Sequence, residues 1–265
     1  FWREMPGLEK GKEYAYQYLI DGEIRVAEKK KKKILDPWND QYISEATYPG
    51  LLEYPEEKTE GIVAVLHPGK EEYQWEITDF QVPEKEKLVI YELLIRDFSE
   101  EHTFKAVREK LDYLEDLNIN VLEMMPVNEF EGNSSWGYNP SFYFAPDKYY
   151  GPKNELKKII DEWNKRGIAV VIDMVLNHSY GQSPLVQMYM DNWTITPENP
   201  WYNEESNFKN SQLRWGYDFN HEADVVKELV DSVNSFWMTE YKVDGFRFDF
   251  TKGFSNTPFG EGSWG

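Results

Sequence analysis

The sequence predicts an α/β fold in which parallel strands alternate with helices, preceded by a smaller all-β region. Ile168 to Val175 is an almost continuous apolar run, which is typical of a parallel strand covered on both faces. From residue 88 onward, short apolar runs alternate with segments whose apolar residues have helical spacing. Residues 1 to about 84 lack a helical period and are punctuated by prolines, which favours a small β-sandwich.

Four strands and three helices are expected after a linker at residues 83–87, and such βαβ units are right-handed. The expected strands are residues 88–94, 118–124, 168–175 and 244–250. Thr103 is expected to cap the first helix and Asn154 the second, with Gly167 closing the second. The residues expected to face inward are Phe104, Val107, Leu111 and Leu114, then Leu156, Ile159, Ile160 and Trp163, then, on a helix over residues 222–241, Val225, Val226, Leu229, Val233 and Phe236.

The first 84 residues are interpreted as one domain and residues 85–265 as a second. Residues 14–20 alternate and are followed by Asp21-Gly22, which predicts a hairpin turn, and residues 61–66 predict another strand. Five consecutive lysines at residues 29–33 repel one another, so a solvated loop is expected there.

Composition excludes some classes of function. The chain has 265 residues with 29 Lys+Arg and 48 Asp+Glu, a formal net charge of −19, which disfavours nucleic acid as a partner. It has no cysteine, so disulfides are excluded. No apolar run reaches transmembrane length and no signal peptide is visible, so a membrane partner is not expected and the compartment is left open. The chain begins at Phe1 rather than Met, so its natural start is expected upstream.

The segment from Asp244 to Phe250 is interpreted as a buried strand that ends by presenting a carboxylate. Because side chains alternate on a strand, Phe246 and Phe248 share one face, and Arg247 and Asp249 share the other. A neighbouring positive charge lowers a carboxyl pKa, so Arg247 is expected to hold Asp249 ionised. Taken alone, the pair fits a nucleophile or a structural ion pair equally well. Asp173 also follows an apolar strand, and two such strand ends fit an α/β barrel with its active site at that rim.

Two motifs carry a family resemblance. The segment Asp173-Met-Val-Leu-Asn-His178 is similar to the first signature of the α-amylase superfamily, glycoside hydrolase family 13, and Gly245-Phe-Arg-Phe-Asp249 resembles its second. Residues 1–84 resemble the immunoglobulin-like domain that precedes the barrel in pullulanase-like and branching members, although they begin part-way into it. The resemblance implies that residues 85–265 are the first half of a (β/α)8 barrel and that the preceding β-sandwich is incomplete.

The resemblance also implies roles. Asp249 matches the nucleophile of a retaining mechanism on α-glucans such as starch, glycogen and pullulan, and Arg247 matches the arginine that orients it. Asp173 and His178 match residues that bind the reacting sugar, and Tyr138 matches the aromatic platform beneath it. Lys252 follows the nucleophile and is either a lysine that reaches a sugar hydroxyl or an ordinary surface lysine.

Two further expectations come from the resemblance. Asn177 and Asp218 resemble calcium ligands, and both offer the oxygen atoms that calcium prefers. However, Gly253 stands where many calcium-binding members have histidine. The family's general acid lies on a fifth strand, and Glu261 lies in a glycine-rich tail without strand context. An incomplete enzyme is therefore expected, with a non-catalytic carbohydrate-binding module as the alternative.

Overall fold

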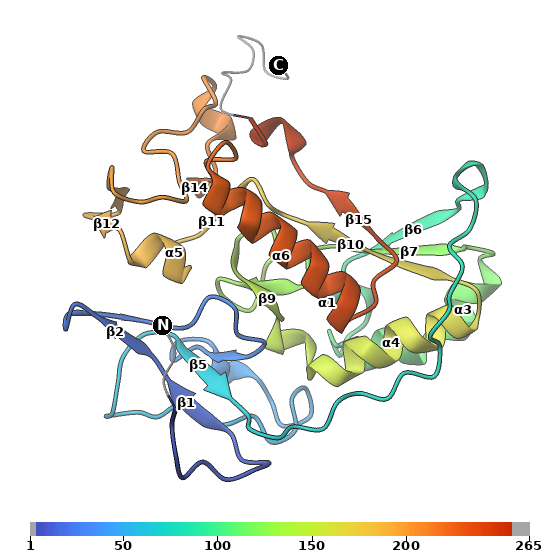
Figure 1. The fold of residues 1–265 in the computed structure, drawn as a ribbon. Coiled ribbons are helices and arrows are strands. Elements are labelled where there is room, and N and C mark those ends of the chain that lie inside the picture. Colours follow the sequence, from blue (N-terminus) through green and yellow to red (C-terminus); the bar gives the residue numbers. More distant parts are fainter. Residues whose placement is uncertain (1–3, 256–265) are drawn as a thin grey trace.

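The computed structural model describes residues 4–255 and is organised around a four-stranded parallel sheet (Figure 1). Its strands are β6 (Ile90–Leu93), β7 (Val121–Met124), β10 (Ala169–Met174) and β15 (Gly245–Phe248). They lie side by side in chain order, and every neighbouring pair is parallel. All four predicted strands are thus present, and the sheet fits part of a (β/α)8 barrel.

Helices connect these strands and cover the sheet with their apolar faces. They are α2 (Phe104–Glu109) and α3 (Leu111–Asp116) after β6, α4 (Lys153–Lys165) before β10, and α6 (Asp224–Glu240) before β15. The side chains predicted to face inward on the first two helical segments are all buried. The segment predicted as one helix from Thr103 is interrupted at Lys110, which separates α2 from α3.

The predicted helix ends are correct at two positions and wrong at one. The Thr103 side chain accepts a hydrogen bond from the Ala106 N–H at 3.2 Å, as an N-cap does. Gly167 follows α4 with a φ of 79°, the left-handed conformation that ends many helices. The predicted Asn154 cap is wrong, because α4 already begins at Lys153 and Pro152 stands at the cap position with a φ of −64°.

Helix α6 packs with Val226, Leu229, Val233 and Trp237 buried. The predicted inward position of Val225 is wrong, since its side chain is 38% exposed. Adjacent residues on a helix point about 100° apart, so Val225 and Val226 cannot both lie on the centre of one face.

The interpretation of the last strand as buried is also wrong. Within residues 4–255, β15 pairs only with β10 and forms one edge of the sheet. Phe248 is therefore 37% exposed, and the Arg247 side chain is 43% exposed. The predicted alternation holds, because the rings of Phe246 and Phe248 stack with centroids 5.6 Å apart.

The N-terminal region contains two small antiparallel sheets. One has the order β1 (Tyr14–Tyr16), β5 (Val63–Leu66) and β4 (Ile34–Leu35); the other is a hairpin of β2 (Tyr18–Ile20) and β3 (Ile24–Val26). The predicted hairpin turn is confirmed, since Asp21 and Gly22 both have positive φ values of 52° and 79°. The domain boundary near residue 84 stays a prediction.

Shorter elements fill the connections between the main strands and helices. They are α1 (Ile95–Phe98), the ribbon of β8 (Asn128–Phe130) and β9 (Pro140–Pro146), α5 (Pro184–Gln187), the pair β11 (His178–Ser179) and β14 (Tyr217–Asp218), and the pair β12 (Met190–Asp191) and β13 (Thr194–Ile195). The 3₁₀ turns are η1 (Asp40–Tyr42), η2 (Lys85–Lys87), η3 (Lys148–Tyr150), η4 (Ser211–Leu213) and η5 (Thr251–Gly253). No helix among the described residues is long and apolar enough to span a membrane.

Buried charged groups are among the contacts that attach the N-terminal region to the barrel part. The buried Lys148 ammonium lies 2.6 Å from Glu129 Oε1 and 3.2 Å from Asp40 Oδ1, which joins η3, β8 and η1. The buried Asp161 carboxylate of α4 accepts hydrogen bonds from the Glu76 and Ile77 N–H groups. The incoming chain is therefore held against α4 before it enters β6.

The expectation of a loop at the five lysines is confirmed, but the lysines are not simply solvated, since only Lys30 and Lys32 are exposed. Each of lysines 29–33 places its ammonium over an aromatic ring, at 4.5 to 5.8 Å from the ring centre. The rings belong to Trp201, Phe144, Tyr16, Phe236 and Tyr48, in the order of the lysines. Cation–π contacts of this kind offset part of the cost of holding like charges together.

Candidate active site

The carboxylates predicted to share a rim do so, at the ends of two neighbouring strands. Asp173 is the last residue but one of β10, and the register of the sheet pairs it with Arg247 of β15. The Asp249 N–H donates to the Met174 carbonyl at 3.1 Å, so the sheet pairing continues one step beyond β15. Because parallel strands end at the same edge, Asp173 and Asp249 lie together.

One guanidinium nitrogen joins the two aspartates. Arg247 Nη1 lies 3.1 Å from each carboxylate oxygen of Asp173 and 2.6 Å from Asp249 Oδ1. The Asp173 side chain is fully buried, whereas that of Asp249 is 20% exposed. The predicted direct contact between Arg247 and Asp249 is confirmed, and Asp249 is the more exposed of the two carboxylates.

Asp173 is held by a second donor from the loop after β8. The Tyr138 hydroxyl donates to Asp173 Oδ2 at 2.7 Å. Burial, together with nearby Asp249, raises the pKa of Asp173 to about 6, against the opposing influence of Tyr138 and Arg247. Asp173 therefore changes its charge close to neutral pH.

His178 ties the Tyr138 loop to β11. Its Nε2–H donates to the Tyr138 carbonyl at 2.8 Å, because a carbonyl can only accept. Its own carbonyl accepts from the Tyr143 hydroxyl at 2.6 Å. Burial lowers the pKa of the His178 imidazole, so the ring is neutral at pH 7. Gly137, with a φ of 90°, lets the loop approach closely, since a Cβ there would lie 2.5 Å from the Pro126 carbonyl oxygen.

The chain turns sharply directly after Asp249. Phe250 has a φ of 47° and a ψ of 49°, a left-handed conformation that is costly for a residue with a side chain. Its ring stacks on Phe208 with centroids 4.8 Å apart and contacts Trp215. These contacts hold the turn, and η5 then places Lys252 on the exposed surface next to the site.

Of the two residues that resemble calcium ligands, Asn177 directly precedes β11 and Asp218 is the last residue of β14. The β11–β14 register pairs His178 with Asp218, so Asn177 lies one step from this pair. Asn177 Oδ1 is buried and has no hydrogen-bond partner among residues 4–255. Asp218 accepts hydrogen bonds from the Asn203 side chain at 2.7 Å and the Asn207 N–H at 3.2 Å, and burial raises the pKa of its carboxyl group.

Gly253 packs directly against this group. A Cβ at residue 253 would lie 2.7 Å from the Asn177 Cβ, so the structure has no room for a side chain there. The departure from the family pattern at residue 253 thus has a steric reason. A buried amide oxygen without a hydrogen-bond partner among residues 4–255 could bind a hard cation such as calcium.

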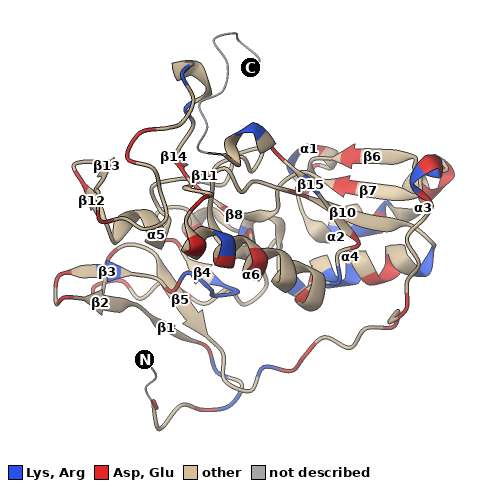
Figure 2. Cartoon of the chain, turned by 45° about the horizontal axis from the view of Figure 1, so that its top comes forward, with Lys and Arg blue, Asp and Glu red and all other residues tan. Residues whose placement is uncertain are grey.

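Two acidic residues of the site were missed by the sequence analysis. Glu92 and Glu123 face each other across β6 and β7, and with Asp173 they bring carboxylate oxygens within 4.8 Å of one another. Burial and the neighbouring Glu92 raise the pKa of Glu123, whereas Arg247 lowers it. Figure 2 shows acidic positions near the ends of both strands. The available signal in the sequence was a glutamate near the end of each of two apolar strands. The three carboxylates together could hold a cation.

Comparisons with known proteins agree with this geometry. Residues 96–260 match the family model described as "Alpha amylase, catalytic domain". A malto-oligosyltrehalose trehalohydrolase of Saccharolobus solfataricus is 31% identical over 199 residues, covering 74% of this chain and 32% of the relative. The chloroplastic isoamylase 1 of Arabidopsis thaliana is 29% identical over 282 residues, covering 90% and 35%.

Solved structures show the same fold. The type I pullulanase of Bacillus subtilis, complexed with maltose, has a TM-score of 0.59 at 25% identity and covers 70% of this chain and 30% of its own. The GBS pullulanase SAP, in complex with maltotetraose, has a TM-score of 0.63 at 22% identity, with 89% and 33% covered. The chain spans about a third of the length of the curated relatives it matches. Since the family model covers more than half of the chain, the protein belongs to the α-amylase catalytic-domain family.

Proposed function

We propose that this chain supplies the nucleophile and part of the sugar subsite of a retaining glycoside hydrolase that acts on α-glucans. The observation that carries this proposal is the contact of Arg247 with both Asp173 and Asp249 at one strand rim. A structural ion pair would need only one of these carboxylates. Two carboxylates on one arginine, with the outer one exposed, fit a group that is oriented for attack.

In this proposal Asp249 attacks the anomeric carbon of the bound sugar. Arg247 binds Oδ1, which leaves Oδ2 as the attacking oxygen. The bond from Oδ2 to C1 forms as the bond from C1 to the glycosidic oxygen breaks, and a general acid protonates the departing oxygen. Water then cleaves the glycosyl-enzyme with retention of configuration. We assign that acid to no residue among 4–255, and Glu261 lies outside the described residues.

The remaining site residues would bind the sugar. Asp173 and His178 would contact the hydroxyls of the reacting unit, Tyr138 would stack beneath it, and Lys252 would reach a neighbouring hydroxyl. Trp136, Trp193 and Trp215 have large exposed fractions, and exposed indole rings suit the apolar faces of sugars. Starch, glycogen and pullulan are the substrates we propose, in line with the isoamylase and pullulanase relatives.

Covalent labelling tests the nucleophile without depending on a general acid. A fluorinated α-maltosyl fluoride has a leaving group that departs without protonation. We expect Asp249 to form the bond to C1 as the C1–fluorine bond breaks, and mass spectrometry to find the added sugar on the peptide that contains Asp249. Asp249→Asn should remain unlabelled, whereas Asp224→Asn, at an exposed carboxylate of α6, should be labelled normally. Labelling of another residue, or none at all, would contradict the proposal, and glucan binding without any labelling would favour a non-catalytic binding protein.

We further propose that Asn177 and Asp218 hold calcium. Asn177 and Asp218 would supply oxygen ligands to the ion, which would give the buried Asn177 Oδ1 a partner. Adding EDTA should lower the thermal unfolding midpoint, and excess calcium should restore it. Asn177→Ala should remove this response while leaving the protein folded. An unfolding midpoint that is identical with and without EDTA would contradict the calcium site.

A further inference from the structure

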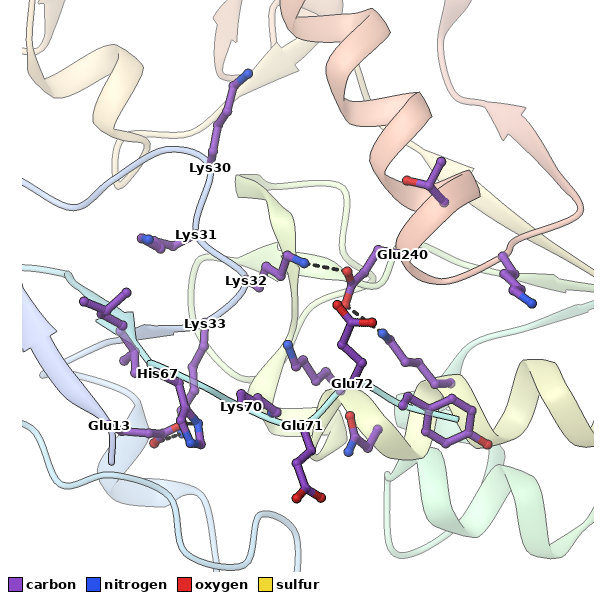
Figure 3. A pocket seen from close by; sticks show the side chains of 18 of the residues that line it. Glu13, Lys30, Lys31, Lys32, Lys33, His67, Lys70, Glu71, Glu72 and Glu240 are labelled. Carbon is purple, nitrogen blue, oxygen red and sulfur yellow. Dashed lines mark hydrogen bonds and ion pairs between the residues drawn. The ribbon is translucent and has the colours of Figure 1, made fainter. Parts of the chain in front are cut away.

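A pocket of about 680 Å³ lies between the N-terminal region and the barrel helices (Figure 3). Its wall consists of the lysine run, residues 65–75, the first residues of α4 and the last residues of α6. None of Tyr138, Asp173 and Asp249 lines it. The pocket is therefore separate from the proposed active site, and a ligand could bind in it whether or not the proposed function is correct.

The charge of the pocket is opposite to that of the chain. Eight lysines and four glutamates line it, although the whole chain carries −19. The lysines are residues 30–33 together with Lys70, Lys153, Lys157 and Lys242. Gathering like charges in a hollow is costly, and an anionic ligand would offset that cost.

Ion pairs within the protein use only some of these lysines. Lys32 and Lys157 share Glu240, at 2.5 and 2.7 Å, as Figure 3 shows for Lys32. Lys33 pairs with Glu13 at 2.7 Å. Among residues 4–255, neither Lys70 nor Lys153 has an ion-pair partner. Lys30 and Lys242 also lack an ion-pair partner there, but their ammonium groups lie over the rings of Phe144 and Trp75. Among the described residues, Lys70 and Lys153 are thus the pocket lysines with neither kind of contact.

Lys153 is the more confined of these two groups. Burial lowers its pKa to about 8, and the nearby charges of Lys70, Lys32 and Lys157 contribute. Burial also lowers the pKa of Lys70. Lys153 is the first residue of the 13-residue helix α4, where the positive end of the helix adds to the attraction for an anion. An anion placed between Lys70 and Lys153 would meet both ammonium groups and this helix end.

The rest of the pocket wall suits a ligand that carries hydroxyl groups as well as a negative charge. Glu71 and Glu72 are exposed at the pocket and can accept hydrogen bonds from hydroxyl groups. In Figure 3 Glu71 points away from Lys32 and Glu240, so it does not neutralise that part of the pocket. Trp75 and Tyr48 add half-buried aromatic surface to the wall, with lysine ammonium groups over both rings.

We propose that this pocket binds a sugar phosphate, with the phosphate between Lys70 and Lys153 and the sugar hydroxyls toward the glutamates. Because the wall comes from both the N-terminal region and helices α4 and α6, such a ligand would hold these two parts of the protein together. This would add to the attachment provided by Lys148 and Asp161.

Titration calorimetry with three probes tests the chemistry of the ligand. Glucose 6-phosphate, inorganic phosphate and glucose would each be titrated into the protein at low and high ionic strength. We expect glucose 6-phosphate to bind most tightly, inorganic phosphate more weakly and glucose not measurably, with affinity falling as salt rises. Maltotetraose, added to saturation, should leave the affinity for glucose 6-phosphate unchanged. Equal affinities for phosphate and glucose 6-phosphate would overturn the sugar part of the proposal, and competition by maltotetraose would overturn a separate site.

Matched lysine variants test the location. Lys70→Met and Lys153→Met should each weaken binding of glucose 6-phosphate by about tenfold or more, the size of one charge-assisted hydrogen bond. Lys158→Met is the control, because Lys158 lies on the same helix, pairs with Glu155 and does not line the pocket. Lys153→Met removes an unpaired charge and is expected to unfold no more easily than the parent protein. Unchanged affinity in both pocket variants, or no binding of glucose 6-phosphate at millimolar concentration, would overturn the proposal.

Discussion

Replacing Arg247 by methionine tests the centre of the proposed active site. The change keeps an unbranched side chain and removes the nitrogen that contacts Asp173 at 3.1 Å and Asp249 at 2.6 Å. A hydrogen bond to a charged group contributes about 1.5–3 kcal/mol. Loss of the bond that orients Asp249 should therefore slow the labelling of Asp249 by the fluorinated α-maltosyl fluoride roughly 10- to 150-fold, since about 1.4 kcal/mol corresponds to a factor of ten. Arg247→Lys should recover part of the loss, because it restores a positive charge.

The same variant has an expected pH dependence. The folded-state pKa of Asp173 is raised to about 6, so the stability linked to its protonated form is fully present below pH 4 and is lost as the pH rises through 6. Arg247 opposes this shift, so its removal raises the pKa of Asp173 further. Urea unfolding should therefore find Arg247→Met more strongly destabilised at pH 7 than at pH 5. In the pH profile of the labelling rate of Asp249, the acidic limb should move to higher pH.

Arg166→Met is a matched control for this experiment. Arg166 Nη1 also contacts two carboxylates, those of Asp112 and Glu115, but these lie on the surface with side chains 89% and 51% exposed. Exposed ion pairs contribute about 0–1 kcal/mol, so the free energy of unfolding and the labelling rate of Asp249 should change little. The assigned role of Arg247 would be refuted if Arg247→Met were labelled at a rate within threefold of the parent. It would also be refuted if Arg247→Met and Arg166→Met had the same stability to urea at both pH values.

Two further predictions concern stability. Lys148→Met leaves the buried Glu129 and Asp40 without their cation, so urea unfolding should show a loss of about 3–5 kcal/mol; a loss below 1 kcal/mol would mean that the network is not needed. Phe250→Ala and Phe250→Gly both lose the stacking on Phe208, but only glycine removes the left-handed strain, so the glycine variant should be more stable by about 1 kcal/mol. An alanine variant as stable as the glycine variant would show that the turn after Asp249 is not strained.

The parts of the fold that could be predicted from the sequence are those set by local periodicity. The apolar spacing of α4 predicted that Leu156, Ile159, Ile160 and Trp163 are buried, and the four strands follow from short apolar runs. The prediction of an Asn154 cap was wrong because Pro152, two positions earlier, takes the cap position and α4 begins at Lys153. The prediction that β15 is buried was wrong because the number of neighbouring strands is set by the whole sheet and not by the strand's own residues.

The candidate site was predictable where its residues share one strand. Alternation along β15 placed Arg247 and Asp249 on one face, and the structure shows them in contact at 2.6 Å. The Tyr138–Asp173 hydrogen bond spans 35 residues and depends on how the loop after β8 folds back, which no local pattern indicates. Glu92 and Glu123 were missed because each is an isolated glutamate until the register of β6 and β7 brings them together.

The lysine run shows why charge alone is a weak guide to structure. Counted along the chain, residues 29–33 repel one another and predict a solvated loop. In the structure, Trp201, Phe144 and Phe236, which lie more than 100 residues away, provide rings for three of the five, and Glu240 pairs with Lys32. Several of the partners that stabilise the run therefore come from the barrel part, so the run is an attachment between the two regions. Lys70 and Lys153, left unpaired beside it, mark the place where a phosphate would complete that attachment.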